Sequence, residues 1–346
     1  MPDLLHRWPV CSRSIRAGTP GFQPDDPGEG THVPAIRAHR QGYTALNAKL
    51  IDGLGVAREL REAIRTRVGT LAGRGITPGL AVILVGDSPA SKLYVRNKLR
   101  ACCEVGIRTQ VVAFPETVTQ SEILASIQAL NADRAIHGIL VQLPLPRHIQ
   151  VRPILEAIAA EKDVDGFNLY NVGGLVIGDT VFPPCTPYGV MKLLDYENIP
   201  VTGRNATVVG ASNIVGKPMA LMFLEREATV TVCHIKTRDL REYTALADIL
   251  VVAAGRPNLV TAEMVRPGAV VIDVGINRSS DGRFVGDVDF EGVREKASYI
   301  TPVPGGVGPM TVTMLLENTV VAAERGNGAR HAMAARQPSI TEGAVR

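Results

Sequence analysis

Short apolar runs alternate with amphipathic segments in the first half of the chain. GLAVILVG at 79–86, TQVVAF at 109–114 and GILVQ at 138–142 predict strands. SKLYVRNKLRACCEVG at 91–106 and SEILASIQALNAD at 121–133 place apolar residues every three or four positions and predict helices. Strands that alternate with helices form a parallel sheet, which binds ligands at the carboxyl ends of its strands. We therefore expect an α/β fold.

The same alternation returns in the second half. NATVVGASNIVGKPMALMFLE at 205–225 predicts a strand, a tight turn and a helix, and further strands are expected at 229–233, 247–255 and 269–277. A helix at 188–197 would carry the chain from the first group of elements to the second. We expect two domains, each a mostly parallel sheet flanked by helices, the second a Rossmann-type NAD(P)-binding domain.

The expected boundaries follow from composition. TPVPGGVGPMT at 301–311 contains three prolines and three glycines, which is too rigid for a mere linker. It should return the chain to the first domain, with a helix at 310–323. The domains are therefore expected at 46–187 plus 310–325, and at 188–309, and a disordered tail is expected at 326–346.

The first 45 residues are rich in arginine, proline, glycine and histidine and show no period, so we expect a disordered extension. Arg7, Arg13 and Arg16 leave a transit peptide as an alternative, although Asp25, Asp26 and several prolines count against it. A start codon chosen too far upstream would give the same appearance.

Composition excludes several classes of function. The chain has 346 residues, is 45% hydrophobic and contains no apolar run of transmembrane length, so no membrane partner is expected. With 37 basic and 34 acidic residues, the formal charge of +3 is too balanced to suggest nucleic acid. Five cysteines are spaced neither as a disulfide framework nor as a metal set, so we expect a cytoplasmic protein without a metal ion.

The helix at 91–106 carries the first candidate residues. Arg96, Arg100 and Glu104 form a polar stripe, and the opposite side holds Tyr94, Lys98, Ala101 and Val105. Tyr94 and Lys98 are therefore expected to point inward. Because burial favours the neutral form of an amine, Lys98 could serve as a general base. The alternative is a lysine that lays its stem over an apolar groove, beside an ordinary core tyrosine.

Gln142 and two aspartates follow predicted strands or helices. Gln142 ends a strand before the LPLP turn and could be no more than a turn-capping amide. Asp163 and Asp165 lie in the loop KDVDGF, where paired aspartates commonly cap a turn, and two carboxylates alone are a weak metal signal.

A second set of candidates lies around the turn that begins at Gly210, Ala211 and Ser212. Their small side chains would let the backbone approach a pyrophosphate at the start of the next helix, although G-x-G-x-x-G is not present. The next strand ends in His234, Ile235, Lys236, Thr237 and Arg238, with bases where NAD sites carry an acid, which favours NADP. Ile276, after a later strand, should lie against the nicotinamide or its ribose, or only in the sheet core.

Several stretches resemble the tetrahydrofolate dehydrogenase/cyclohydrolase family, whose bifunctional members are methylenetetrahydrofolate dehydrogenases and methenyltetrahydrofolate cyclohydrolases. They are VGDSPASKLYVRNKLRACCEVGI, GILVQLPLP, KDVDGFNLYNVG and TPVPGGVGPMTV, and with the turn at 210–218 the likeness runs from about residue 50 to about residue 325. The resemblance implies a catalytic Lys98 that Tyr94 and Gln142 orient, pterin binding by Asp165 with Tyr94, NADP as cofactor, and a homodimer. Asp163 is left structural.

The sequence departs from the family pattern at the cofactor turns. Members commonly place serine or arginine where Ile235 stands, and some have arginine where Ala211 stands, so the choice of NADP depends on Lys236 or His234. Gly174, in place of the family's arginine, and Arg100, in place of a lysine, are milder changes.

The resemblance implies NADP-dependent oxidation of 5,10-methylenetetrahydrofolate to the 5,10-methenyl compound and its hydrolysis to 10-formyltetrahydrofolate. Two alternatives stay open on the residues alone. An oxidoreductase similar to shikimate or amino-acid dehydrogenases would share the two-domain layout but lack the VQLPLP and DVDGF stretches. A non-catalytic folate-binding protein would keep the pocket but should have lost Lys98.

Overall fold

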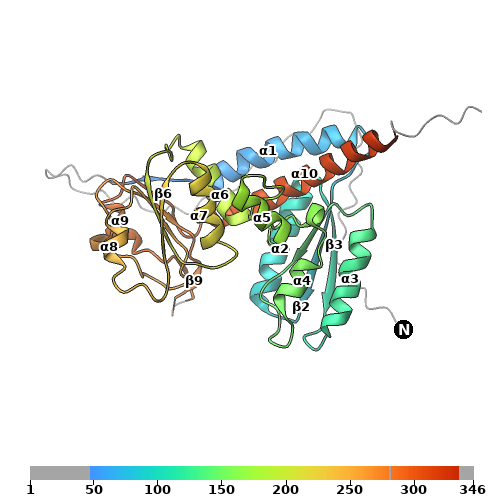
Figure 1. Cartoon of the computed structure of the whole chain (residues 1–346), viewed down its shortest axis with the longest axis horizontal. Helices are drawn as coiled ribbons and strands as arrows, with labels where there is room; N and C mark the ends of the chain where they lie inside the picture. The colour runs from blue at the N-terminus through green and yellow to red at the C-terminus, as the bar shows by residue number, and fades with distance from the viewer. Residues whose placement is uncertain (1–46, 280–281, 335–346) are drawn as a thin grey trace, which may run out of the picture.

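The structure, a computed structural model, describes residues 47–279 and 282–334. The expected extension at 1–45 lies outside these ranges, as do residues 335–346 of the expected tail. The described chain forms two lobes, each built on a parallel sheet, with the helices α1 (Gly53–Ala72) and α10 (Val307–Ala334) side by side along one edge of the molecule (Figure 1). The α/β class and the two-domain layout predicted from the sequence are confirmed.

The first lobe contains a sheet of three parallel strands in the order β3-β2-β4. The central strand β2 (Gly79–Val85) is buried along its whole length, as expected for a strand with helices on both faces. β3 (Arg108–Phe114) and β4 (Gly138–Val141) flank it.

Alternate side chains of β2 enter different cores, because successive residues of a strand point to opposite faces. Leu80, Val82 and Leu84 pack with apolar residues of α1, α10 and α2 (Pro89–Val105). Ala81, Ile83 and Val85 pack with α3 (Gln120–Ala132) and α4 (Val151–Glu156). The sheet is thus held between two helical layers, and the carboxyl ends of its strands remain available to the site.

The second lobe contains a six-stranded parallel sheet in the order β1-β11-β8-β7-β5-β6. The bounds of its strands are β1 (Lys49–Leu50), β5 (Asn205–Val209), β6 (Thr229–Cys233), β7 (Ile249–Val252), β8 (Val270–Asp273) and β11 (Tyr299–Ile300). α7 (Gly216–Glu225) packs against β5 and β6 and covers one face. α8 (Arg241–Thr244), η2 (Ala262–Met264) and α9 (Phe290–Arg294) complete the larger elements of this lobe, with a short antiparallel pair, β9 (Asn277–Arg278) and β10 (Phe284–Val285).

Two of the segments in which the chain passes between the lobes lie against each other. β1 pairs with β11 in the second sheet, and the Ile51 amide donates to the Ile300 carbonyl at 2.9 Å just before α1 begins. A Cβ on Gly53 would lie 1.9 Å from the carbonyl oxygen of Gly306, so only glycine fits there. β1 therefore belongs to the second sheet, although its residues fall in the range 46–187 expected for the first domain.

Three segments differ from the sequence predictions. The sequence predicts a helix over 151–160, but α4 ends at Glu156 and a 3-10 turn, η1 (Ala160–Lys162), follows it. α5 (Leu169–Ile177), which Asn168 caps through the Tyr170 amide, was not predicted. α10 continues past residue 326, where a disordered tail was expected, because extending a long helix costs far less than starting one.

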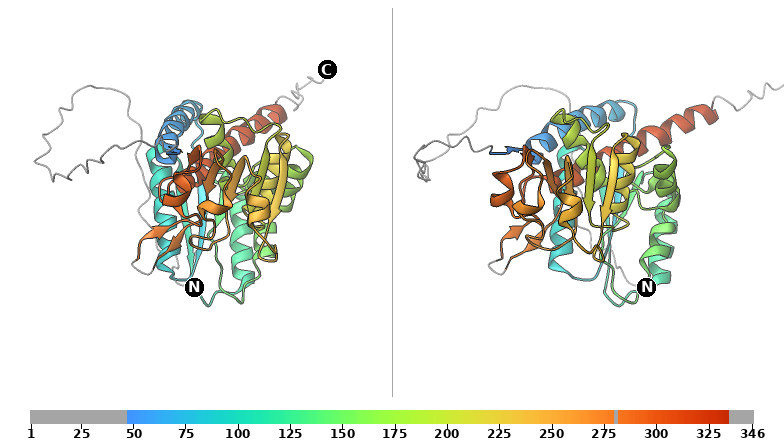
Figure 2. Two further views of the ribbon diagram at one scale, coloured as in Figure 1. Left: turned by 90° about the vertical axis from the view of Figure 1, so that its left-hand side faces the viewer. Right: turned by 60° about the vertical axis from the view of Figure 1, so that its left-hand side comes forward.

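α6 (Cys185–Tyr196) packs against α10, α1 and α7, and thereby joins the two lobes. In two further views, which look more nearly along the line joining the lobes, α1 (blue) and the outer end of α10 (red) lie at the top of the molecule (Figure 2). None of the helices in the described ranges combines the length and the apolar character that crossing a membrane requires.

Candidate functional site

α2 carries the first candidate residues, and its ends explain its position. Ser88 accepts from the Ser91 amide, Pro89 occupies the first turn, and Gly106 ends the helix in a left-handed conformation at φ 86°. Ala101 and Val105 are buried and Arg96 is exposed, as the sequence period predicted.

Lys98 lies on α2 next to the end of β4. Its Nζ donates to the Oε1 of Gln142 at 3.1 Å, and the Nε2 of Gln142 donates to the Leu143 carbonyl at 2.7 Å. This second bond fixes which end of the amide faces the amine. The structure thus brings together the lysine and the glutamine that the family resemblance paired. Lys98 itself is half-buried.

Tyr94 lies one turn before Lys98 but is not a core residue. Its side chain is 41% exposed, whereas the helical pattern placed it inward beside Lys98. The expectation of a buried Tyr94 was therefore wrong. The helical period gives the direction of a side chain but not whether another element covers it, and here the ring remains accessible to a ligand.

Asp165 lies close to Lys98 in the loop after η1. Burial raises the pKa of its carboxyl above the usual value, while the charge of nearby Lys98 opposes the rise. Burial likewise raises the pKa of Cys185 well above that of a free thiol, so this cysteine acts as a neutral donor. A half-buried carboxylate next to an ammonium suits a ligand that carries adjacent N–H donors.

Asp163 takes a structural role in the same loop. It is buried and accepts from the Asn168 amide at 2.7 Å and from the Nδ2 of Asn171 at 2.8 Å. These bonds tie the start of α5 to the loop. Asp165, two residues along the same loop, is only half-buried. Leaving Asp163 structural agrees with this arrangement.

Two residues that the sequence reading missed support the Asp165 loop. Asn318, buried on α10, donates to the carbonyls of Val164 at 2.9 Å and Pro183 at 3.1 Å, and the Sγ of Cys185 donates to Val164 at 3.3 Å. Asn318 follows Met310 and Met314 at intervals of four, so an amide on the apolar face of a helix was the available signal.

The cofactor candidates occupy the carboxyl end of β5. A Cβ on Gly216 would lie 1.9 Å from the Gly210 carbonyl oxygen, and a Cβ on Gly210 would lie 2.1 Å from the Ala253 carbonyl oxygen. The Ser212 Oγ accepts from the amides of Val215 at 3.1 Å and Gly216 at 3.4 Å, which fixes the turn where α7 begins. With Ala211 half-buried beside it, this tight turn at a helix N-terminus fits a dinucleotide pyrophosphate.

The next strand, β6, ends in exposed basic residues. His234 and Lys236 are exposed, and the Lys236 amide donates to the Nδ1 of His234 at 3.2 Å. Ile235 between them is 97% exposed, so its side chain makes no core contact. Basic side chains with no acid among residues 234–238, at the end of β6, fit a 2′-phosphate better than a ribose hydroxyl.

Two buried carboxylates hold the backbone turns that follow β7 and β8. Asp287 accepts from the amides of Ala254 at 2.7 Å and Gly255 at 2.8 Å. Asp273 accepts from Gly275 at 2.9 Å and from the Asp287 amide at 3.0 Å. Burial raises the pKa of Asp273 to about 6, against the hydrogen bonds that lower it.

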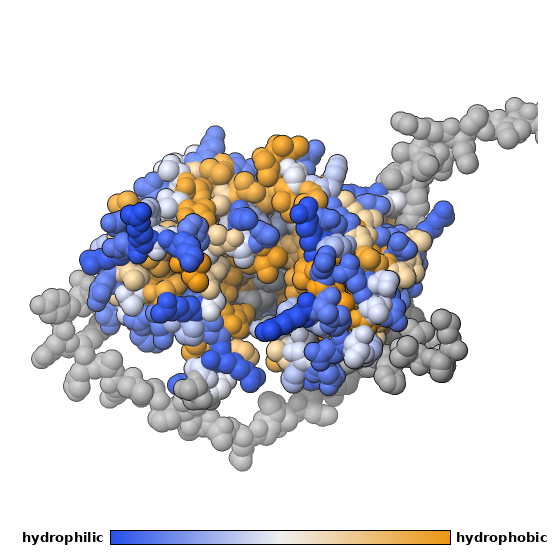
Figure 3. Space-filling view, turned by 60° about the horizontal axis from the view of Figure 1, so that its bottom comes forward, coloured by the Kyte–Doolittle hydropathy of each residue, from blue (hydrophilic) through white to orange (hydrophobic). Residues whose placement is uncertain are grey.

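Ile276, which follows β8 in the second lobe, lies beside the start of α10. Its side chain is 46% exposed, and a Cβ on Gly308, at the start of α10, would lie 3.7 Å from its Cδ1. The surface is hollowed between the two lobes (Figure 3). In the described ranges, no three histidine, cysteine or acidic side chains gather as a metal site would require.

Two family models match this chain. The catalytic-domain model of tetrahydrofolate dehydrogenase/cyclohydrolase matches residues 51–165, and the NAD(P)-binding-domain model of the same family matches residues 184–327. Together they cover most of the sequence, and the second match begins at residue 184, just before α6.

Curated relatives and solved structures agree with these matches. Bifunctional protein FolD of Nitrosospira multiformis is 61% identical over 282 residues, 82% of this chain and 98% of the relative, and that of Bordetella petrii is 58% identical over 281 residues, 81% and 96% of the two chains. The FolD methylenetetrahydrofolate dehydrogenase/cyclohydrolase of Campylobacter jejuni superposes with a TM-score of 0.80 at 55% identity, over 80% of this chain and 99% of that one. The Trypanosoma brucei FolD, solved with NADP and an inhibitor, gives 0.78 at 41% identity, over 81% and 98%.

Proposed function

Because this chain belongs to the tetrahydrofolate dehydrogenase/cyclohydrolase family, we propose that it catalyses both reactions of that family. It oxidises 5,10-methylenetetrahydrofolate to 5,10-methenyltetrahydrofolate with NADP and hydrolyses the product to 10-formyltetrahydrofolate. The observation that carries this function is the bond between Lys98 and Gln142, with Asp165 beside it in the lobe that faces the glycine turn.

Substrate binding is assigned to Asp165 and Tyr94. The carboxylate of Asp165 accepts two parallel N–H donors from the amino group and ring nitrogen of the pterin. The ring of Tyr94, accessible at 41% exposure, packs against the folate. Cys185 and Asn318 hold the loop so that this carboxylate keeps its position when the ligand arrives.

The protein contributes positioning to the oxidation step. Bound NADP would accept a hydride from the bridging carbon of the folate. Gly210, Ala211 and Ser212 would hold its pyrophosphate, and Lys236 with His234 its 2′-phosphate. Ile276, beside Gly308 at the start of α10, would keep the nicotinamide end against the first lobe.

Lys98 performs the hydrolytic step as general base and acid. In its neutral form it removes a proton from the water that attacks the bridging carbon of the methenyl cation. It returns a proton to N5 as the bond between N5 and that carbon breaks, and the proton of the new hydroxyl is released to solvent. Gln142 orients the amine throughout, since its own amide group is fixed by Leu143.

The remaining assignments rest on the sequence and the family. We assign residues 46–187 with 310–325 to the folate-binding domain and 188–309 to the NADP-binding domain, with β1 transferred to the second. A homodimer in the cytoplasm is expected, with neither nucleic acid nor a membrane as partner.

Purified protein given 5,10-methylenetetrahydrofolate and NADP should form NADPH and 10-formyltetrahydrofolate, with the methenyl compound as an intermediate in the absorbance record. Parallel titrations with NADP and NAD then measure the cofactor preference. Absence of hydride transfer to either cofactor would refute the dehydrogenase assignment, and accumulation of the methenyl compound at its spontaneous rate of hydrolysis would refute the cyclohydrolase assignment.

A further inference from the structure

Asp287 is fully buried in the second lobe and joins two turns at the carboxyl ends of neighbouring strands. Its Oδ2 accepts from the amides of Ala254 at 2.7 Å and Gly255 at 2.8 Å, in the turn after β7. Its Oδ1 accepts from the Nδ2 of Asn277 at 2.8 Å, in the segment after β8. Since β7 and β8 pair in the sheet, one carboxylate holds both turns together.

This network encloses Ile276, the residue assigned to the nicotinamide end of the cofactor. Before it, the Gly275 amide donates to Asp273 at 2.9 Å, and the Asp287 amide donates to the same Asp273 oxygen at 3.0 Å. After it, Asn277 donates to Asp287. A Cβ on Gly275 would lie 2.3 Å from the Cγ of Asp287, so this turn packs directly on the carboxylate. The main chain at Ile276 is therefore fixed on both sides.

The same carboxylate reaches the glycine turn after β5 through one peptide group. The N–H and C=O of a trans peptide point in opposite directions, so the bond from the Ala254 amide to Asp287 turns the Ala253 carbonyl away from Asp287. That carbonyl oxygen lies against Gly210, where a Cβ would be only 2.1 Å from it. Asp287 thus connects the turn assigned to the pyrophosphate with the turn assigned to the nicotinamide.

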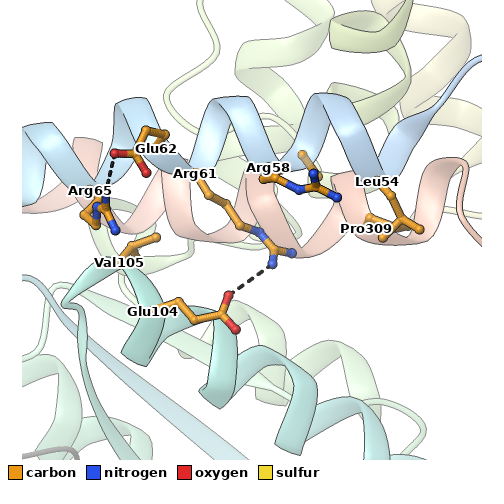
Figure 4. A pocket seen from close by; sticks show the side chains of 9 residues that line it. Leu54, Arg58, Arg61, Glu62, Arg65, Glu104, Val105 and Pro309 are labelled. Carbon is orange, nitrogen blue, oxygen red and sulfur yellow. Dashed lines mark hydrogen bonds and ion pairs between the residues drawn. The ribbon is translucent and has the colours of Figure 1, made fainter. Parts of the chain in front are cut away.

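Other contacts hold the site of hydrolysis. α2, which carries Lys98, packs against α1 and α10, and Arg61 of α1 pairs with Glu104 of α2 at 3.5 Å (Figure 4). Gln142 orients Lys98 from the end of β4. These contacts lie within the first lobe and do not include Asp287. A change at Asp287 should therefore reach the oxidation step without reaching the hydrolytic one.

We propose that Asp287 and Asn277 are positioning residues for the oxidation of methylenetetrahydrofolate, and that hydrolysis of the methenyl compound does not need them. They hold Ile276 in a fixed relation to the glycine turn. This spacing decides how closely a cofactor bound at the turn can bring its nicotinamide to the folate. The inference rests on the proposed function, and it divides the two activities between two sets of residues.

Asp287→Asn tests the proposal, because it keeps the shape of the side chain. When the new amide oxygen faces Ala254 and Gly255, its NH2 group must face the NH2 group of Asn277, and the two turns are forced apart. We expect kcat for oxidation at saturating NADP to fall by about 10-fold or more. The Kd of NADPH, from fluorescence titration, should rise only severalfold. Methenyltetrahydrofolate supplied without cofactor should be hydrolysed at the parent rate.

Exchanging the two side chains tests the bond itself. In Asp287→Asn combined with Asn277→Asp, the oxygen at position 287 can accept from the backbone amides while its NH2 group donates to the carboxylate at position 277. The double variant should oxidise faster than either single variant, a coupling that a double-mutant cycle measures. Asn277→Ala, at a half-buried position, is a milder change that should slow oxidation and spare hydrolysis, even where Asp287→Asn does not fold.

Asp248→Asn is the matched control. Asp248 also accepts from a backbone amide, that of Asn205 at 2.9 Å, but it lies at the amino end of β7. It should keep the parent ratio of oxidation to hydrolysis.

Three results would overturn the positioning role. They are an equal loss of both activities in Asp287→Asn, oxidation at the parent rate in both Asp287→Asn and Asn277→Ala, and a double variant no faster than the single ones. Absence of oxidation by the parent protein with either cofactor would instead overturn the proposed function.

Discussion

The Nζ of Lys98 and the Oε1 of Gln142 lie 3.1 Å apart, across the space between α2 and the end of β4. Because the other end of the amide is bonded to the Leu143 carbonyl, the oxygen is the atom that Gln142 presents to the amine. An acceptor held in this way fixes where the lysine places its lone pair or its protons.

Replacing Lys98 by methionine should remove the hydrolytic step while the folate still binds. Loss of a general acid and base should reduce kcat for methenyltetrahydrofolate hydrolysis by about 100-fold or more, and the Kd of the folate should change only severalfold. Stopped-flow absorbance measures the first quantity and fluorescence titration the second. Lys92→Met, on the same helix and paired with Asp87, is the control; hydrolysis by Lys98→Met at the parent rate would show that the catalytic assignment is wrong.

A carboxylate in place of the Gln142 amide should move the pH dependence of hydrolysis. Gln142→Glu would set a negative charge about 3 Å from the amine and stabilise the ammonium form, which is inactive as a base. The rising limb of the kcat profile should therefore shift to higher pH. An unshifted profile at a reduced kcat would mean that Gln142 acts only as a structural residue.

The exposed Ile235 offers a test of cofactor choice. Ile235→Asp would place an acid at the end of β6, where a carboxylate binds the ribose hydroxyls of NAD and repels a 2′-phosphate. We expect KM for NADP to rise about 10-fold and KM for NAD to fall. Leu246→Asp, a change at another exposed position of the second lobe, should leave both values as they were, and a retained NADP preference in Ile235→Asp would place the ribose phosphate elsewhere.

The glycine turn should tolerate no added methyl group. In Gly216→Ala the new Cβ would lie 1.9 Å from the Gly210 carbonyl oxygen, and the backbone must shift at a cost of about 1–3 kcal/mol. Thermal unfolding should report the loss, and KM for NADP should rise with it. The same substitution at Gly69, in the interior of α1 with open space around it, should instead stabilise the protein by about 0.5–1 kcal/mol; equal melting temperatures for Gly216→Ala and the parent would contradict the geometry.

Asp273 should make folding stability depend on pH. Its pKa rises from 3.8 to about 6 in the folded protein through burial beside Asp287. The folded state thus holds the proton more tightly than the unfolded state, and the stability that this gives is present below pH 4 and lost as the pH rises through 6. The loss amounts to about 3 kcal/mol.

Urea unfolding between pH 4 and 7 checks this dependence. The free energy of unfolding of the parent, minus that of Asp273→Asn, should fall across this range, because the amide does not titrate. A difference that stays constant with pH would show that Asp273 remains ionised throughout.

The sequence predicted the regular parts of the fold well and the long-range pairings poorly. The strands β2 to β4 and the helices between them follow from the local period of apolar residues. The pairing of Lys49 with Tyr299 involves positions far apart in the chain, which no local period encodes. α5 escaped prediction because it is short and contains two adjacent glycines, which disfavour a helix.

The candidate site was predictable only in part. Periodicity placed Lys98 on the side of Ala101, but its pairing with Gln142 came from likeness to a family. The support of the Asp165 loop by Asn318 depends on α10 returning to the first lobe, so it could not be read from the KDVDGF stretch alone.

The paired crossings near Gly53 and Gly306 limit how the enzyme can move. Together with α6, these two touching segments connect the lobes. Movement of one lobe against the other must therefore keep the two segments packed at this point. A side chain at position 53 would part the two segments, and the lobes would lose their common alignment before either of their cores was disturbed.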